Sequence, residues 1–252
     1  MILPHTFDDV RHVYHADGRY VLSTSDVIDL NGLTPNYDAI KKSTLDNASN
    51  RGKCCHKAIE LYEQNDPTWD EHLETDWLPY MDGWFAFRDE HSIQIVGPHE
   101  KAYVYEHEGT DAVIGGTVDL RFIYGGYLYI ADIKTSCPVS KAALETKRLA
   151  WRLQTESYKT ATEMDEQFMR AVIDQIHGIR RMVIHIHPDL KPTYQNPQRC
   201  HGYELHEFTM DDSLLWDAAV RVAQAKKAAG ILPSRRHVDV AGDLRASLEV
   251  MA

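Results

Sequence analysis

The sequence predicts a domain of the α/β or α+β class, with a mixed β-sheet flanked by helices. The chain has 252 residues, of which 43% are hydrophobic and 26% charged, a composition typical of a globular protein with its own core. Segments with strand-like periodicity lie between segments with helical periodicity, which is the pattern of that class. A Gly-Gly pair between two runs of β-branched and aromatic residues adds a hairpin.

The elements follow from the N-terminus. Residues from about 1 to 50 are expected to form a helical and loop-rich extension, with one short helix capped within Ser23–Asp26. A firmer helix is expected from Asn50 to Tyr62, and an aromatic-rich helix over Trp77–Phe87 packs into the core.

The second half alternates between strands and helices. One domain is expected over residues 1–252, with a strand and a helix as a C-terminal extension from about 200 to 252. The predicted strands are Val113–Tyr124, Tyr127–Thr135, Arg181–His187 and Tyr203–Thr209, and the predicted helices are Lys141–Thr162 and Asp211–Ala229.

Charge is unevenly distributed along the chain. The net charge is −11, which argues against binding a polyanion through lysine and arginine alone. However, residues 141–159 and 221–236 each carry five basic residues, while 60–76 carries seven acidic and no basic ones. A bound divalent cation would also invert the local sign of charge.

No apolar run reaches the roughly 20 residues of a membrane-spanning helix, so no membrane association is expected. The first residues lack the basic and apolar segments of a signal peptide, which predicts a cytoplasmic protein. The cysteines are Cys54, Cys55, Cys137 and Cys200, whose spacing fits neither a disulfide framework nor a clustered metal site. Free thiols are expected.

The hairpin carries the most informative residues. If Tyr124 pairs with Tyr127 across the Gly-Gly turn, Asp119 lies opposite Asp132, and Lys134 shares their face. Opposed carboxylates repel each other, and a cation between them removes that cost; Mg²⁺ and Mn²⁺ prefer such oxygen ligands. The alternative is a solvated outer face, but Tyr127–Thr135 is apolar on both faces, which indicates a covered strand.

Gln154 and Tyr158 lie four residues apart on one face of the helix predicted after this strand. That face is largely apolar, so both polar groups need partners. A substrate phosphate, the backbone of the active-site strand, or each other as a satisfied core pair would serve.

These residues resemble the PD-(D/E)XK nuclease superfamily. Asp119 matches its first acidic position, and Asp132 and Lys134 match its (D/E)-x-K pair. Arg51-Gly52-x-x-x-His56 and Gln154-x-x-x-Tyr158 are similar to motifs of the RecB-like branch, and Leu22–Ile28 to the start of phage-type exonucleases. Glu100 takes the place of the glutamate on the preceding strand, with Glu90, Glu106 and Glu108 as competitors.

The resemblance implies a restriction-endonuclease-like core of αβββαβ order and a Mg²⁺- or Mn²⁺-dependent nuclease, most simply an exonuclease acting on linear DNA with ends. It implies a role in phage or bacterial recombination and repair, beside a single-strand annealing or recombination protein, and allows an oligomer. The cysteines do not match the iron–sulfur cluster of some relatives, so none is expected. The implied metal ligands are His56, Glu100, Asp119, Asp132 and the carbonyl of Ile133.

In this interpretation the cation activates water and Lys134 stabilises negative charge at the phosphate. Asp119, Asp132, Lys134, Gln154 and Tyr158 form the catalytic set. The residues expected to contact DNA are Arg51, Lys141, Lys147, Arg148, Arg152 and Lys159.

Two other classes stay open. The first is a catalytically inactive module that binds nucleic acid or protein on the same fold. The second is a zinc protein that uses His185-x-His187 with Cys200-His201 and His206, since imidazole and thiolate suit zinc.

Overall fold

The computed structural model describes residues 1–8, 13–34, 40–136, 141–188 and 202–233, with the side chains of 141–143 and 146 left out of the description. The strands are β1 (Thr6–Asp8), β2 (Val13–Ala16), β3 (Arg19–Ser23), β4 (Gln94–Ile95), β5 (Lys101–Glu106), β6 (Val113–Val118), β7 (Leu120–Tyr124), β8 (Tyr127–Thr135), β9 (Ile179–Ile186) and β10 (Tyr203–Phe208). The helices are α1 (Thr24–Leu30), α2 (Lys42–Glu63), α3 (Leu78–Glu90), α4 (Lys141–Met164), α5 (Glu166–Val172) and α6 (Ser213–Ala228), with 3₁₀ turns at Thr75–Trp77 and Ile173–Gln175.

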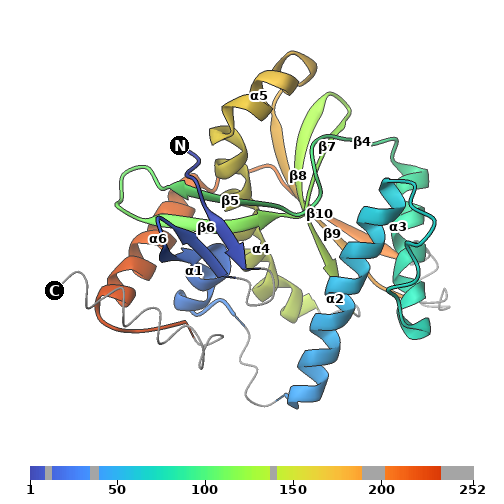
Figure 1. Ribbon diagram of the computed structural model, residues 1–252, viewed down its shortest axis with the longest axis horizontal. Helices are drawn as coiled ribbons and strands as arrows, with labels where there is room; N and C mark the ends of the chain where they lie inside the picture. The colour runs from blue at the N-terminus through green and yellow to red at the C-terminus, as the bar shows by residue number, and fades with distance from the viewer. Residues whose placement is uncertain (9–12, 35–39, 137–140, 189–201, 234–252) are drawn as a thin grey trace.

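The strands form two five-stranded sheets rather than one central sheet. Their orders are β1-β2-β3-β6-β5 and β10-β9-β8-β7-β4 (Figure 1). Each sheet is mixed, because β3–β6 and β8–β9 are parallel pairs and the other pairs are antiparallel. The mixed α/β class predicted from the sequence is therefore confirmed, with the strands divided over two sheets.

The helices cover both faces of the β10–β4 sheet. Helix α4 contacts β8 and β9 from one side and reaches β5 and β6 of the other sheet. Helix α2 contacts β8, and α3 contacts β9 and β10, so these helices lie on the opposite side (Figure 1). Side chains of β8 alternate accordingly: Leu128 and Ile130 join the core cluster of α4, and Ala131 and Ile133 join that of α2 and α3.

The predicted strand Val113–Tyr124 is broken at Asp119. Residues before it, in β6, pair with β5 and β3, while residues after it, in β7, pair with β8 and β4. The backbone N–H of Glu100, just before β5, donates to the carbonyl of Asp119 at 3.0 Å. Asp119 and Glu100 therefore meet where the chain passes from one sheet to the other.

The hairpin has the predicted register. Tyr124 pairs with Tyr127, and the ladder ends at the pair of Leu120 and Ala131. Asp119 and Asp132 are the next residue on each strand beyond that pair. Gly125 and Gly126 have φ of 56° and 80°, the left-handed conformation that a two-residue turn of this kind requires.

The N-terminal region differs from the loop-rich segment expected. Strands β1, β2 and β3 belong to the first sheet, where β3 pairs in parallel with β6. These strands have only 3 to 5 residues, too few to show a periodicity. The predicted cap is confirmed, because Ser23 and Asp26 form a capping box at α1.

The other predicted elements match in type and differ at their ends, while β4, β5 and α5 were not among the predicted elements. Helix α2 begins at Lys42, earlier than the predicted Asn50, and α4 ends two residues beyond Thr162. Within the described part of the chain, none of the helices has the length and apolar character needed to cross a membrane.

Candidate metal centre

A group of polar side chains gathers around the end of β8. Asp119 comes from the junction of β6 and β7, Asp132 and Lys134 from β8, and His56 from α2. Asp119 is 8% exposed and Asp132 only 1%. Two carboxylates at such depth are costly unless they are protonated, hydrogen-bonded or paired with positive charge.

Asp119 is held by the backbone of β8. Its Oδ2 accepts a hydrogen bond from the N–H of Ile133 at 2.8 Å. Burial, followed by repulsion from Asp132, raises the pKa of Asp119 from 3.8 to about 7, although His56 and Lys134 act in the opposite direction. The side chain of Asp119 therefore changes its protonation state near neutral pH.

Asp132 is paired on both of its oxygens. The ammonium of Lys134 lies 2.7 Å from Oδ2, and the hydroxyl of Tyr158 donates to Oδ1 at 3.5 Å. Gln154 Nε2 in turn donates to the Tyr158 hydroxyl oxygen at 2.6 Å. Of the partners left open for Gln154 and Tyr158, the structure shows the pair with each other. It adds a partner that was not predicted, the side-chain carboxylate of Asp132 in β8.

The ring of His56 lies close to three of the other expected metal ligands. Its Nδ1 lies 3.1 Å from Glu100 Oε1 and 3.9 Å from Asp119 Oδ2, and its Nε2 lies 3.0 Å from the carbonyl oxygen of Ile133. A carbonyl and a carboxylate only accept, so both ring nitrogens carry protons in this arrangement. Burial disfavours the charged ring, but Asp119, Glu100 and Asp132 together raise its pKa to about 9.

Helix α2 is anchored so that His56 faces this group. Cys55, Ala58 and Ile59 are buried in the core on its inner side. The guanidinium of Arg51 donates to the carbonyl of Thr135 at 3.2 Å and lies 5.0 Å from the centre of the Tyr80 ring. Arg51, expected to contact DNA, therefore holds α2 against the end of β8 and against α3.

The donor atoms of the group suit a hard divalent cation. Asp119, Asp132 and Glu100 offer carboxylate oxygens, and Ile133 offers a carbonyl oxygen, the ligand types preferred by Mg²⁺ and Mn²⁺. The protonated imidazole of His56 bridges Glu100 and Ile133. A cation bound to these oxygens would take over the charge that His56 supplies.

The competing glutamates lie elsewhere. Glu90 accepts from the hydroxyl of Tyr203 at 2.5 Å. Glu106 is at the far end of β5, and Glu108 is in the turn that follows it. Glu100 is thus the glutamate that the structure brings to His56.

The basic residues of α4 fall into two groups. Arg152 pairs with the buried carboxylate of Asp212, and Lys159 lies 3.2 Å from Glu156 and 3.7 Å from Glu163. These acidic partners neutralise both side chains in the structure, and their expected role as DNA contacts stays a prediction.

Lys147 and Arg148 have no acidic partner within the described residues. Burial, together with Lys134 nearby, lowers the pKa of Lys147. Lys147 is therefore near enough to Lys134 for the two charges to repel each other. The side chain of Lys141, also expected to contact DNA, is not among those that the structure describes.

A buried ion network under α4 was missed by the sequence reasoning. Arg181 lies 3.0 Å from Glu156 and 2.7 Å from Asp212, and each of the three residues is at most 2% exposed. The partners are separated by 25 and 31 residues along the chain. No local motif marks such a set.

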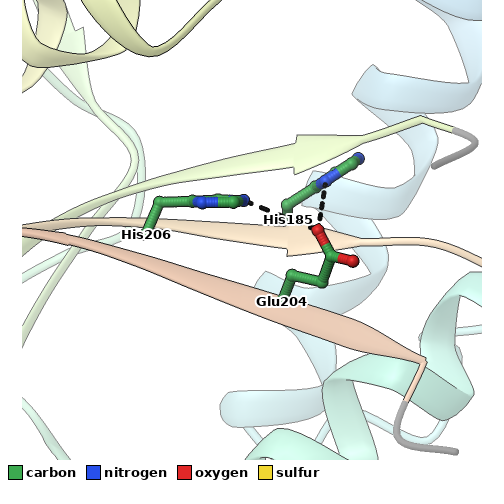
Figure 2. A group of neighbouring side chains, drawn as sticks. All are labelled: His185, Glu204 and His206. Atoms are coloured by element: carbon green, nitrogen blue, oxygen red, sulfur yellow. Dashed lines mark ion pairs between the residues drawn. The ribbon is translucent and has the colours of Figure 1, made fainter. Parts of the chain in front are cut away.

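The late histidines form a second cluster, with a member that was not predicted. His185, Glu204 and His206 bring one ligand atom each to within 4.8 Å of one another, and Figure 2 shows the Glu204 carboxylate beside both rings. His187 is a ring neighbour of His185 at 5.8 Å, while Cys200 and His201 lie outside the described residues. The alternation Glu204-x-His206 on a strand was the signal for the missing ligand.

The cysteines with described positions are free thiols. Cys54 is half-buried and Cys55 buried. Burial raises the pKa of Cys55 to about 12, so it remains protonated at neutral pH. Cys137 and Cys200 lie outside the described residues.

Comparison with known proteins adds little. No family model and no curated protein matches the chain. One solved structure that it resembles is described as "Crystal structure of SSO0001", with 12% identity and a TM-score of 0.32 over 70% of this chain and 75% of that one. A likeness at this level carries no argument about function, so the function has to be inferred from the site.

Proposed function

We propose that the protein is a divalent-metal-dependent deoxyribonuclease of the PD-(D/E)XK type, acting on linear DNA. The observation that carries the proposal is the pair of buried carboxylates, Asp119 and Asp132, with Lys134 at 2.7 Å from Asp132. A fold gains nothing in stability from two neighbouring carboxylates at such depth, whereas a cation site uses them as ligands.

The arrangement of elements supports the same proposal. Helix α2 supplies His56, β5 follows Glu100, β6–β7 and β8 supply the aspartates, and α4 and β9 complete the order. If β6 and β7 are counted as one strand broken at Asp119, and α3, β4 and α5 as insertions, this succession supports the αβββαβ order of a restriction-endonuclease-like core, which we propose for this region. The additions to it are strands β1, β2 and β3 of the first sheet and helices α1 and α6.

In this proposal Asp119, Asp132, Glu100 and the Ile133 carbonyl hold Mg²⁺ or Mn²⁺. When bound, the ion lowers the pKa of a ligand water and neutralises charge on the scissile phosphate. Asp119 must be deprotonated for this purpose, and its pKa of about 7 allows that at neutral pH. Tyr158 fixes the orientation of the Asp132 carboxylate through Oδ1.

Lys134 is the group that acts on the phosphate. Its side chain is 32% exposed, so the ammonium reaches the surface while remaining beside Asp132. An ammonium at that position orients a water and stabilises the negative charge that develops in the transition state. Lys147 and Arg148, one helix away and without acidic partners in the described part of the chain, are the proposed contacts for flanking phosphates.

The experiment compares linear and circular DNA of the same sequence with purified protein in Mg²⁺, Mn²⁺ or EDTA. The proposal expects loss of linear DNA with either ion, none in EDTA, and intact circular DNA. Binding of linear DNA without cleavage in any ion would indicate the inactive module instead. Cleavage that persists in EDTA would exclude the metal mechanism.

A further inference from the structure

A second group of potential ligands lies on the same face of the β10–β4 sheet, one strand beyond Lys134. His185 of β9 is the neighbour of Lys134 of β8 in the parallel ladder, and Glu204 of β10 lies directly opposite His185. His206 is two residues beyond Glu204 and therefore on the same face. Trp151 of α4 packs on both rings, at 5.9 Å from His185 and 5.1 Å from His206.

The hydrogen bonds of His185 determine which of its nitrogens is available. Nε2 lies 3.2 Å from the carbonyl oxygen of Ser136 and 2.8 Å from its hydroxyl. A carbonyl oxygen only accepts, so Nε2 carries the proton and Nδ1 presents a lone pair. A histidine that donates its other N–H to a backbone carbonyl is the usual arrangement of a metal ligand.

The carboxylate of Glu204 faces one ring nitrogen of each histidine. Glu204 Oε2 lies 3.9 Å from Nδ1 of His185 and 3.8 Å from Nε2 of His206 (Figure 2). Both nitrogens are buried and have no hydrogen-bond partner among the described residues. His185 is fully buried and His206 is 9% exposed. Buried polar atoms without partners are rare and require an explanation.

We propose that His185 Nδ1, Glu204 Oε2 and His206 Nε2 bind a Zn²⁺ ion that is separate from the metal centre of Asp119 and Asp132. Two imidazoles and one carboxylate are a ligand set of zinc, and they are poorly suited to Mg²⁺, which requires oxygen ligands. The fourth position is open to water.

The geometry needs only small side-chain movements. The three ligand atoms lie within 4.8 Å of one another. Tetrahedral zinc with bonds of about 2.0–2.2 Å separates its ligand atoms by about 3.4 Å. The side chain of Glu204 is 34% exposed, so the ion has a route from solvent and the carboxylate can rotate toward the rings.

This ion would link β10 to β9 beneath α4. Strand β10 is the edge of its sheet and is paired on one side only, with β9. A metal bridge between His185 of β9 and two residues of β10 would restrain that edge. The proposed role is therefore structural, and it does not depend on the nuclease proposal.

The test is a titration of metal-free full-length protein with Co²⁺, a spectroscopic substitute for Zn²⁺. Wild type should show the intense visible absorption of four-coordinate cobalt, and Zn²⁺ should abolish it stoichiometrically. Glu204→Gln and His206→Gln should weaken binding by at least about tenfold. The signal should persist in the Asp119→Asn/Asp132→Asn double variant, because that variant removes only the other centre.

The matched control is Glu207→Gln. Glu207 lies on the same strand with 35% side-chain exposure, but it faces the other side and pairs with Arg180. The Glu207→Gln variant should bind Co²⁺ with the same affinity as wild type. The proposal is overturned if Glu204→Gln and His206→Gln keep wild-type affinity, if wild type shows no four-coordinate signal, or if the signal disappears in the double aspartate variant while circular dichroism shows that variant folded.

Discussion

The imidazole Nε2 of His56 donates a hydrogen bond of 3.0 Å to the carbonyl oxygen of Ile133, one of the oxygens proposed to bind the cation. Its other nitrogen donates to Glu100 at 3.1 Å. The charged ring thus donates hydrogen bonds to two of the oxygens that are proposed to bind the metal. Metal binding and protonation of His56 therefore compete for the same oxygens.

We predict that the affinity for Mn²⁺ rises with pH between 6 and 9. The pKa of Asp119 is raised to about 7 and that of His56 to about 9, so both groups hold protons at the lower end of this range and lose them toward its upper end. Calorimetric titrations in two buffers of different ionisation enthalpy measure the protons released. An affinity independent of pH would contradict the competition between metal and protons.

Asp119 should lower the stability of the metal-free protein progressively as pH rises from about 4 to about 7. Its folded pKa lies above its ordinary value of 3.8, so this group binds more protons in the folded state within this window, and its contribution to the free energy of unfolding falls. Asp119→Asn keeps the acceptor for the Ile133 N–H and removes the charge. It should be more stable than wild type at pH 7 by on the order of 2–4 kcal/mol, and equally stable near pH 4.

Urea unfolding in EDTA at a series of pH values measures this difference. The decline that His56 adds between 6.5 and 9 should remain in the variant in reduced form, because Glu100 and Asp132 still raise its pKa. A variant with the same stability difference from wild type at every pH would show that Asp119 is ionised throughout.

Lys134→Ala should lower the rate of cleavage far more than the affinity for metal. Loss of a charged group that stabilises the transition state costs on the order of 10²–10³ in rate. The ammonium also pairs with Asp132, so Mn²⁺ should bind as well as before or better once this competitor is removed. Single-turnover cleavage and Mn²⁺ titration are measured side by side, and equal losses in both would make Lys134 structural.

Two double variants separate DNA binding from stability. Lys147→Ala/Arg148→Ala should weaken DNA binding and flatten its salt dependence while the free energy of unfolding stays nearly unchanged. Arg152→Ala/Lys159→Ala should do the reverse, since Arg152 neutralises the buried carboxylate of Asp212. Removing one partner of a buried ion pair costs about 3–5 kcal/mol, and Arg181, which also pairs with Asp212, reduces that loss.

Binding isotherms over a salt series and urea unfolding are recorded for both variants. Lysine and arginine each contribute about one unit of log–log salt slope per phosphate contact. Unchanged binding by Lys147→Ala/Arg148→Ala would move the DNA path away from this end of α4.

The sequence was most informative where the relevant residues are close together along the chain. The Gly-Gly turn fixed the register of β7 and β8, and that register brings Asp119 and Asp132 to the same end of the hairpin. Gln154 and Tyr158 are linked by helical spacing, which the structure confirms as a contact. Placing His56 and Glu100 needed the family resemblance, because 44 residues separate them.

Residues paired across long separations could not be predicted. The ion pair of Arg152 with Asp212 was not predicted, because Asp212 comes 60 residues later. Glu204 was absent from the predicted histidine site; the spacing Glu204-x-His206 puts it on the face of His206, but only strand pairing places it opposite His185. Periodicity and motifs report local geometry, whereas these contacts depend on how strands pair and helices pack.

The central claim is that Asp132 holds a divalent cation that is required for cleavage. It is tested most directly by a Mn²⁺ titration of the Asp132→Asn variant, in which the melting temperature and the loss of end-labelled linear DNA are both measured. The control is Asp82→Asn, on the exposed face of α3. Wild type and Asp82→Asn should gain stability with Mn²⁺ and degrade the DNA, while folded Asp132→Asn should do neither. Cleavage by Asp132→Asn at the wild-type rate, or a wild type that gains no stability from Mn²⁺ at any pH between 6 and 9, would contradict it.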